Sequence, residues 1–370
     1  MRAERNSCCL LLAAALTAGC GSAPGDGRGN LPEGHDADKF EFIRILMGTS
    51  VRILVCAEGA GGAEDAEKAA KAAFAKVAEV DAALSDYRPD SELSRLNDAA
   101  GGPPRAASPL MRDAIEASIF NSSVTHGAFD PTVGPLVGLW REARKSGRLP
   151  DPGALAAART LVSRADLRLD RAGGTVRLAR PGMRLDFGGI GKGFAADRAL
   201  AVLRGLGFPR AMVACAGDIA VGDPPPGRSG WRIRIGADEN APVAVVSACG
   251  VSTSGDTEQF VEIDGRRYSH IVDPRTGLGV ERVVSASVID ANATNADARA
   301  TALCVLGPDA GIRLAEELEG VEARMVWREG GGLRTAQTGG LHGLMAPGNS
   351  QQSTTNFQQT PNAQTPTRPR

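Results

Sequence analysis

Two apolar patterns follow one another near the start of the chain. Apolar and polar residues alternate over 40–57, which predicts two β-strands joined as a hairpin near Met47-Gly48-Thr49. Over 63–84 Ala, Phe and Val recur at helical spacing, which predicts an amphipathic helix. A polar loop containing Tyr87 follows and leads into a short helix. The folded part is therefore expected to begin with a hairpin and a long helix.

The rest of the chain predicts short strands mixed with helices. Ser108 and Pro109 suit the N-cap and first position of a helix that continues toward Thr125. Two alternating runs separated by Arg-Ala-Gly-Gly predict a hairpin. The expected elements are that hairpin over 167–170 and 175–178, strands over 183–187, 211–216, 231–235, 243–247, 260–263, 284–289 and 323–327, and helices around Leu139, up to Gly205, over 296–306 and over 308–318. This order indicates an α+β fold.

The composition is that of a globular protein. The 370 residues are 42% hydrophobic and 4% aromatic, with 46 Gly, 22 Pro and a formal net charge of −1. A chain of this length can form two lobes. Because basic residues are not in excess, the sequence does not indicate a nucleic-acid partner.

The first twenty residues have the features of an export signal. A charged start precedes the apolar run 8–16 and Thr17-Ala18-Gly19-Cys20, and this run is too short to span a bilayer as a mature helix. Small residues before Cys20 resemble a bacterial lipobox, in which the cysteine is lipidated; ordinary signal cleavage nearby is the alternative. We expect a signal peptide over 1–19 and a flexible, Gly- and Pro-rich tether over 20–38.

The other end of the chain also changes composition. After about Gly331 it is rich in Gly, Gln, Asn, Thr and Pro and has almost no apolar periodicity. Such a segment buries too little apolar surface to order itself. We therefore expect the folded domain to cover 39–330 and a disordered tail to cover 331–370.

Four cysteines remain beyond the signal and the lipidation site. Cys56, Cys215, Cys249 and Cys304 lie among apolar residues and form no C-x-x-C pair. We expect buried thiols, and one disulfide in an oxidising compartment is the open alternative.

Four glycines and a lysine interrupt an apolar run in Asp186-Phe-Gly-Gly-Ile-Gly-Lys-Gly-Phe-Ala-Ala-Asp197 and then open into a helix. Glycine allows close approach of a ligand, and a helix N-terminus presents unpaired N–H groups, so this turn suits a phosphate-bearing ligand. Lys192 adds a positive charge. The turn matches neither a Walker A loop nor G-x-G-x-x-G, and glycines used only for tight packing are the alternative.

Asp297 and Thr301 lie four residues apart on a predicted helix, so their oxygens project from one face. With a backbone carbonyl they would suit Mg²⁺, which keeps water and substrate phosphates as its other ligands. A surface Asp and a Thr bonded to its own helix are the alternative, and the pair alone does not decide.

Four motifs occur in order along the chain. The glycine turn is followed by Ser254-Gly-Asp256, His270-Ile-Val-Asp-Pro-Arg-Thr-Gly277 and Asp297-Ala-Arg-Ala-Thr301. Together, and over about 47–327, they resemble the ApbE family of FAD:protein FMN transferases. The resemblance implies an α+β fold of two packed lobes with the flavin dinucleotide cleft between them.

The resemblance also implies the residues of that cleft. Tyr87 would stack on the isoalloxazine, Gly189 would supply the carbonyl ligand to Mg²⁺ beside Asp297 and Thr301, and His270 would bind flavin or transfer a proton. Lys192, His270 and Asp297 are the candidate catalytic residues. The expected FAD-binding residues are Met47, Tyr87, Gly127, Ala128, Phe129, Asp186, Lys192, His270 and Ile271.

The implied reaction is Mg²⁺-dependent transfer of FMN from FAD to a threonine hydroxyl of a partner flavoprotein, with release of AMP. Hydrolysis of FAD to FMN and AMP and a non-catalytic flavin-binding lipoprotein are the alternatives. The expected partners are subunits of membrane redox complexes, reached from the periplasmic side of a bacterial inner membrane through the lipid on Cys20. The chain departs from the family pattern at Thr257, where relatives have an aromatic residue, and at Ala214-Cys-Ala-Gly-Asp218, where Asn-x-Gly-Gly-Asp is commoner.

Overall fold

The computed structural model describes residues 38–57, 62–238, 241–255, 260–281 and 283–346. The expected signal peptide, Cys20 and nearly all of the expected tether lie outside these residues, as does Thr257. Within the described ranges no helix is both long and apolar enough to cross a membrane.

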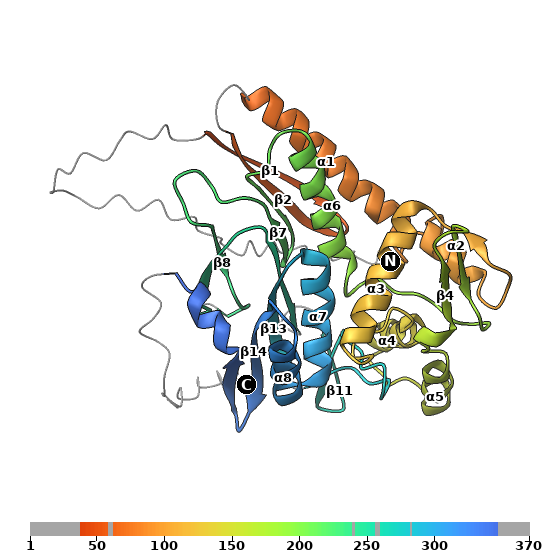
Figure 1. The fold of residues 1–370 in the computed structure, drawn as a ribbon. Coiled ribbons are helices and arrows are strands. Elements are labelled where there is room, and N and C mark those ends of the chain that lie inside the picture. The colour runs from red at the N-terminus through yellow and green to blue at the C-terminus, as the bar shows by residue number, and fades with distance from the viewer. Residues whose placement is uncertain (1–37, 58–61, 239–240, 256–259, 282, 347–370) are drawn as a thin grey trace, which may run out of the picture. The chain divides into compact units, whose positions relative to one another are not determined.

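An eight-stranded sheet in which all neighbours are antiparallel forms the centre of the fold (Figure 1). Its strand order is β1-β2-β6-β7-β10-β13-β14-β15. The strands are β1 (Asp38–Leu46), β2 (Thr49–Ala57), β6 (Ala211–Cys215), β7 (Asp218–Val221), β10 (Cys249–Gly255), β13 (Val283–Asp290), β14 (Glu322–Glu329) and β15 (Gly332–Gln337). The first hairpin pairs Asp38 with Ala57 through to Leu46 with Thr49, as the alternation predicted.

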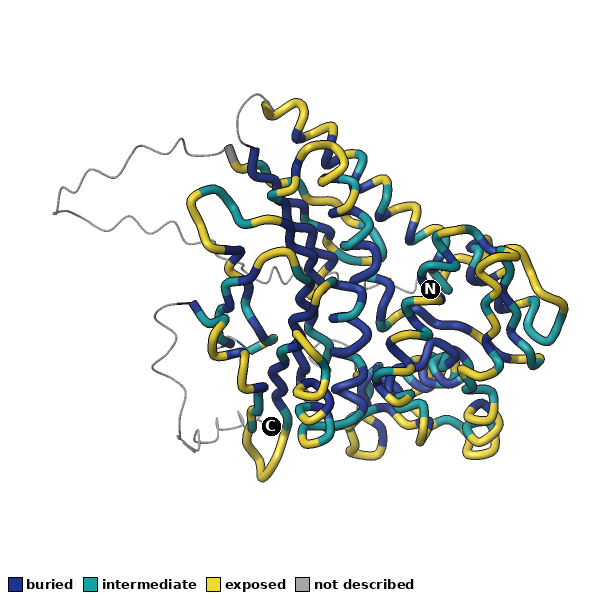
Figure 2. Tube along the Cα trace, in the orientation of Figure 1, coloured by how far each residue is buried: buried dark blue, intermediate teal, exposed yellow. Residues whose placement is uncertain are grey.

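Both faces of this sheet are buried at its centre, as the dark strands of Figure 2 show. In β2, Ile53 and Val55 belong to a core shared with the helices, whereas Leu54 and Cys56 belong to a second core on the other face. This division follows the two-residue period of a strand. The helices of the first core are mainly α1 (Ala63–Leu84), α6 (Gly191–Gly205), α7 (Ala293–Leu306) and α8 (Pro308–Glu317). The second core is covered by β8 (Trp231–Arg234), β9 (Val243–Val246) and the 3₁₀ helix η2 (Gly339–Leu344).

A smaller region joins the helical side of the sheet. It contains α2 (Glu92–Asp98), α3 (Pro109–Val124), α4 (Gly134–Ser146), α5 (Pro152–Thr160) and a three-stranded sheet of β3 (Arg105–Ala106), β5 (Thr175–Leu178) and β4 (Leu167–Asp170). Ser108 caps α3 by accepting a hydrogen bond from the Met111 amide, and Pro109 is its first residue, as predicted. The separate hairpin β11 (Phe260–Ile263) and β12 (Arg266–Ser269) contributes Tyr268, which packs on Trp140 of α4. The expected α+β fold class is confirmed.

The expected strand over 183–187 is wrong. This segment makes only one isolated bridge, between Arg184 and Val133. The side chain of Asn97 takes the place of a neighbouring strand, because it accepts from the Leu185 amide at 2.7 Å and donates to the Leu185 carbonyl at 3.0 Å. Met183, Leu185 and Phe187 are buried as in a strand, but the Asn97 side chain satisfies the backbone of Leu185.

The expected start of the disordered tail at residue 331 is also wrong. β15 pairs along its length with β14, and the polypeptide remains ordered to Ala346. Leu341 of η2 is fully buried in the second core, and the Ala346 amide donates to the Val243 carbonyl at 2.8 Å. A few buried contacts therefore order a segment whose composition is mostly polar. Residues 347–370 lie outside the described part of the chain.

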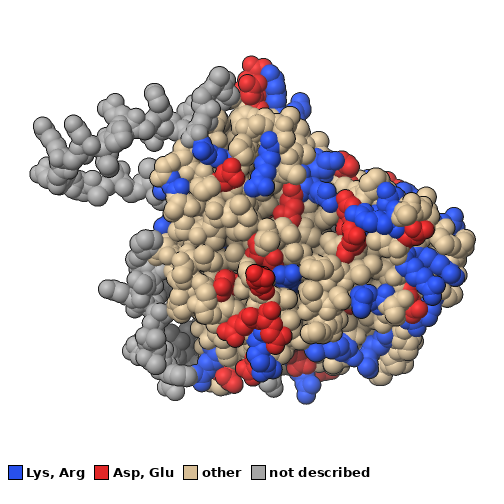
Figure 3. All heavy atoms as spheres, in the orientation of Figure 1, with Lys and Arg blue, Asp and Glu red and all other residues tan. Residues whose placement is uncertain are grey.

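Charges of both signs are interspersed on the face shown in Figure 3, in keeping with the net charge of −1. Cys56, Cys215 and Cys304 are buried and Cys249 is half-buried, and all four are free thiols. The expectation of buried thiols is thus confirmed for three of them.

Candidate functional site

The glycine turn lies between the Asn97-bound segment and α6. The amides of Ile190 and Gly191 both donate to the Phe187 carbonyl, which closes the turn directly before the helix begins at Gly191. Asp186 fixes its other end, because its carboxylate accepts from the Gly188 amide at 2.7 Å. Sequence therefore predicted the turn and the start of the helix correctly.

Lys192 on the first turn of α6 forms an ion pair with Asp218 at the start of β7. Asp218 is 1% exposed, and it also accepts a hydrogen bond from the Ser252 hydroxyl of β10. Burial alone would lower the pKa of Lys192, but the nearby carboxylates of Asp218 and Asp297 outweigh it and raise the pKa. Lys192 is therefore a fixed positive charge at the N-terminal end of α6.

Asp297 of α7 faces the same turn. Its carboxylate accepts from the Gly193 amide at 3.0 Å and is 1% exposed. Burial, together with the charge of Asp218, raises the pKa of Asp297 to about 7 despite the opposing effect of Lys192. Two buried carboxylates thus lie near one ammonium group, that of the half-buried Lys192.

Thr301 lies one turn further along α7 and brings Gly189 into the group. A Cβ added to Gly189 would lie 2.9 Å from the Thr301 hydroxyl, so the Gly189 backbone runs directly beside it. The Ser254 hydroxyl of β10 lies 3.3 Å from the same oxygen. The structure thus brings Gly189, Asp297 and Thr301 to one place.

This set of oxygen donors fits a hard cation. Asp218 and Asp297 supply carboxylate oxygens beside Lys192, and the Thr301 hydroxyl lies one helical turn from Asp297 and next to the Gly189 backbone. No three His, Cys, Asp or Glu side chains gather as a metal site among the residues that the structure describes. A cation here would therefore need a carbonyl, a hydroxyl and ligands from outside the protein.

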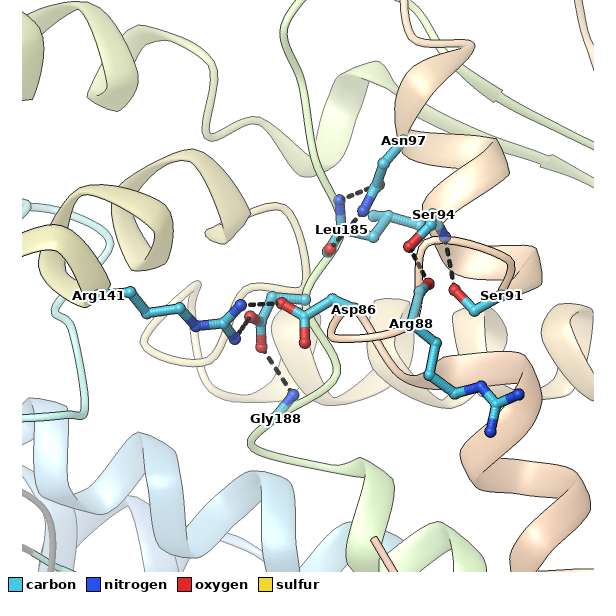
Figure 4. Close-up of polar contacts among 9 residues, drawn as sticks. Asp86, Arg88, Ser91, Ser94, Asn97, Arg141, Leu185 and Gly188 are labelled. Carbon is cyan, nitrogen blue, oxygen red and sulfur yellow. Dashed lines mark hydrogen bonds and ion pairs between the residues drawn. The ribbon is translucent and has the colours of Figure 1, made fainter. Parts of the chain in front are cut away.

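A second cluster joins the Tyr87 loop to the glycine turn (Figure 4). Arg141 of α4 forms ion pairs with Asp86 and, at 3.1 Å, with Asp186. Its guanidinium carbon also lies 4.5 Å from the centre of the Tyr87 ring. Tyr87 itself is 77% exposed. The exposed ring is thus connected to the glycine turn through a single arginine.

The loop after α3 is positioned by its backbone. His126 and Gly127 have φ values of 52° and 78°, and the Gly127 amide donates to the Ser122 carbonyl at 2.8 Å. Ala128 and Phe129 are buried in the main core, so the Phe129 ring packs in the interior. The neighbouring Pro131 carbonyl accepts from the Asp186 amide at 2.8 Å, which places this loop beside the glycine turn.

The β1–β2 turn lies near the Lys192 end of the site. Met47 has a φ of 52° and is half-buried at this turn. The Ser50 carbonyl accepts from the Ala216 amide at 3.1 Å, and Ala216 is two residues from Asp218. Met47 therefore lies on the β1–β2 turn, next to the β6–β7 turn that leads into Asp218, the partner of Lys192.

His270 and Ile271 lie on the loop after β12. His270 is half-buried, whereas Ile271 is buried in the main core. The Trp140 indole donates to the Gly277 carbonyl at 2.8 Å, and Arg275 donates to the Val305 carbonyl at 3.3 Å, so the loop is bound to α4 and α7. These contacts place His270 on an anchored loop, and its role stays a prediction.

Sequence reasoning missed two charged residues of these clusters. Arg141 was hidden because its partners are 55 and 45 residues away in the chain. Asp218 left a weak signal, since a carboxylate at the start of the apolar run Asp218-Ile-Ala-Val221 is out of place unless it has a buried partner.

The sequence profile of the ApbE family matches residues 47–325. A protein of Klebsiella pneumoniae named FAD:protein FMN transferase is 34% identical over 69% of this chain and 75% of its own length. One of the same name from Treponema pallidum is 34% identical over 83% of this chain and 88% of its own length.

Solved structures give the same result. The apo form of the Pseudomonas stutzeri flavinyl transferase ApbE aligns with a TM-score of 0.75 at 33% identity, over 84% of this chain and 98% of that one. The flavin transferase ApbE of Vibrio cholerae aligns with a TM-score of 0.73 at 29% identity, over 83% of this chain and 99% of that one.

Proposed function

Because the chain belongs to the ApbE family, we propose that it transfers FMN from FAD to a threonine hydroxyl of a partner flavoprotein and releases AMP. One observation carries this beyond membership of the family. Lys192, Asp297, Thr301 and the Gly189 backbone converge at the N-terminal end of α6, where a pyrophosphate would meet the positive end of the helix dipole and the positive charge of Lys192.

The proposed reaction breaks one bond and forms one. The acceptor hydroxyl oxygen bonds to the phosphorus of the FMN half, the bond from that phosphorus to the AMP oxygen breaks, and AMP leaves. The hydroxyl proton must go to a base, and we assign this role to His270 on its anchored loop. Lys192 would offset part of the charge that develops on the departing phosphate.

Asp297, Thr301 and the Gly189 carbonyl would hold Mg²⁺, whose charge, when it is bound, would neutralise oxygens of the pyrophosphate. The requirement for a hard cation separates an enzyme from a protein that only stores flavin. Retention of FAD does not demand a cation on its pyrophosphate, whereas cleavage between the two phosphates benefits from one.

We further propose that the enzyme works at the outer face of a bacterial inner membrane, anchored by lipid on Cys20 and serving subunits of membrane redox complexes. The export signal and the residues before Cys20 support this proposal. Cys20→Ala should move the full-length protein from the detergent phase to the aqueous phase in a detergent partition. Unchanged partitioning would reject the anchor without affecting the proposed chemistry.

The decisive experiment is co-expression with a candidate acceptor flavoprotein. The gel band of the denatured acceptor should fluoresce, and mass spectrometry should find FMN on one threonine. Purified protein with FAD and Mg²⁺ should release AMP in step with that modification. AMP and free FMN without any modified acceptor would favour a hydrolase, and bound but intact FAD would favour a non-catalytic flavin-binding protein.

A further inference from the structure

Arg141 of α4 contacts both the Tyr87 loop and the glycine turn. One of its terminal nitrogens pairs with Asp86 and the other with Asp186 (Figure 4). The flat face of its guanidinium lies over Tyr87. A fork of two donors with an aromatic neighbour is an arrangement that arginine makes and lysine does not.

The two carboxylates are connected to different parts of the site. Asp186 accepts from the Gly188 amide, so its position sets the start of the glycine turn. Asp86 directly precedes Tyr87, so its position sets the base of the exposed ring. Their side chains are 9% and 19% exposed, which leaves little water to screen either charge.

We propose that Arg141 is a positioning residue that fixes the Tyr87 ring relative to the glycine turn, so that the isoalloxazine and the pyrophosphate of one flavin dinucleotide are received in a single arrangement. The inference rests on the proposed function, because it takes FAD as the ligand. A guanidinium on one face of the Tyr87 ring leaves the opposite face for the isoalloxazine. Holding an exposed ring in place before binding lowers the entropy lost when the ligand arrives.

The charges of this cluster predict what happens when Arg141 is removed. Burial and the neighbouring Asp86 raise the pKa of Asp186, and Arg141 opposes them. Without Arg141 two carboxylates would face each other with no cation between them, and the Tyr87 loop would move away from the turn. If that is the mechanism, removing the charge of Asp86 should largely restore the arrangement.

The experiment uses purified full-length protein and FAD in the presence of Mg²⁺. We compare Arg141→Met, Arg141→Lys, the double variant Arg141→Met with Asp86→Asn, and the control Arg88→Met. Arg88 lies next to Tyr87, but its guanidinium points away from Asp86 and pairs at 3.5 Å with the exposed Asp90 (Figure 4). The control therefore removes an arginine from the same loop without touching the cluster.

Titration by flavin fluorescence should show the Kd for FAD rising about tenfold in Arg141→Met, because the change removes the cation from two partly buried ion pairs. Asp86→Asn should recover most of that loss, Arg141→Lys should lie between, and Arg88→Met should match the wild type. The visible absorption and circular dichroism bands of bound flavin should also change in Arg141→Met, because the ring it stacks on is no longer fixed. A purely structural role for Arg141 would not change the spectrum of flavin that still binds.

A measurement without ligand completes the test. Amide hydrogen exchange over 85–91 should accelerate in Arg141→Met and return toward the wild-type rate in the double variant. The inference would be overturned if Arg141→Met kept the Kd for FAD, the flavin spectrum and the amide exchange rates of the wild type. It would also be overturned if adding Asp86→Asn did not restore FAD binding in Arg141→Met. If these variants change FAD binding as predicted but no FMN ever reaches an acceptor, the result rejects the proposed transfer and not the role of Arg141.

Discussion

The Gly193 amide donates to the Asp297 carboxylate at 3.0 Å, so the helix that begins at the glycine turn is bonded directly to the helix that carries the candidate cation ligands. A Cβ on Gly193 would overlap the carbonyl oxygen of Ala293 and lie 2.8 Å from the Cβ of Asp297. The glycine is therefore required for close approach of α6 and α7. The glycine turn and the proposed cation site are therefore held as one unit.

Gly193→Ala should push α6 and α7 apart. The new methyl group has backbone on its far side and cannot be accommodated by a rotamer change, so we expect the free energy of unfolding to fall by about 2 kcal/mol or more. Urea denaturation measures this loss of stability.

Gly138→Ala is the matched control, because Gly138 is exposed on α4 with nothing within 4 Å of the added carbon. That change should stabilise the protein by up to about 1 kcal/mol. Equal effects of both changes would contradict the close approach.

Asp297→Asn should remove the proposed cation site while keeping the fold. An asparagine oxygen can still accept from the Gly193 amide, but it brings no negative charge. We expect AMP release to fall about a hundredfold or more, since metal stabilisation of transition-state charge is worth several kcal/mol. The FAD-bound fraction should fall much less. Chromatography of AMP and a separate FAD titration measure the two effects. The control is Asp309→Asn, which changes an exposed aspartate of α8. Unchanged AMP release would reject Asp297 as a ligand.

Lys192→Met should destabilise the protein through the charges it leaves behind. Asp218 is 1% exposed and would lose its cation, so we expect the free energy of unfolding to fall by about 3 kcal/mol. Asp218→Asn in the same chain should recover part of this loss. A Lys192→Met variant as stable as the wild type would mean that this ion pair contributes nothing to the fold.

Local patterns were sufficient to predict several elements. The alternation over 40–57 and the helical spacing over 63–84 predicted β1, β2 and α1 because each pattern is long and regular enough to be recognised without a distant partner. The cap at Ser108 with Pro109 fixed the start of α3. The glycine turn and Lys192 could be identified because a helix N-terminus with glycines has few other uses.

Other elements depend on partners that are distant in sequence. β7 has only three apolar residues after Asp218, and β10 carries Ser252 and Ser254, so neither has an apolar pattern long enough to predict a strand. They become strands by pairing with each other and with β6 and β13. The positions of Tyr87 and Arg141 likewise depend on ion pairs across α4 and two loops, which no local pattern records.

Two thiols should react very slowly in the folded protein. Burial, the largest effect, raises the pKa of Cys215 to about 12, with Asp218 adding to it, and burial with Asp290 raises the pKa of Cys249 to about 12. At pH 8 only on the order of one such thiol in ten thousand is a nucleophilic thiolate. Because folding raises these pKa values from 9.0, the contribution of the two thiols to stability should be constant below pH 9 and fall as the pH rises toward 12.

Iodoacetamide at pH 8 followed by mass spectrometry checks the thiol prediction. Native protein should remain unmodified at Cys215 and Cys249 under conditions that alkylate the urea-unfolded chain. Alkylation of either at the rate of a free thiol would contradict the burial that raises its pKa.

The C-terminal segment offers a test of where the fold ends. A chain that stops at Gly331 loses the six-residue β15 and the buried Leu341, and leaves the β14 edge unpaired. It also loses Thr338, whose hydroxyl accepts from the Ala323 amide at 3.0 Å and pairs with Glu322. A chain that stops at Ala346 keeps all of these contacts. We expect the shorter chain to lose roughly 3 kcal/mol or more of unfolding free energy, from one buried Leu and several hydrogen bonds. Urea denaturation of both truncations measures the difference, and the longer one should match the full chain. Equal midpoints for the two truncations would mean that β15 and η2 add no stability and that the fold ends at β14.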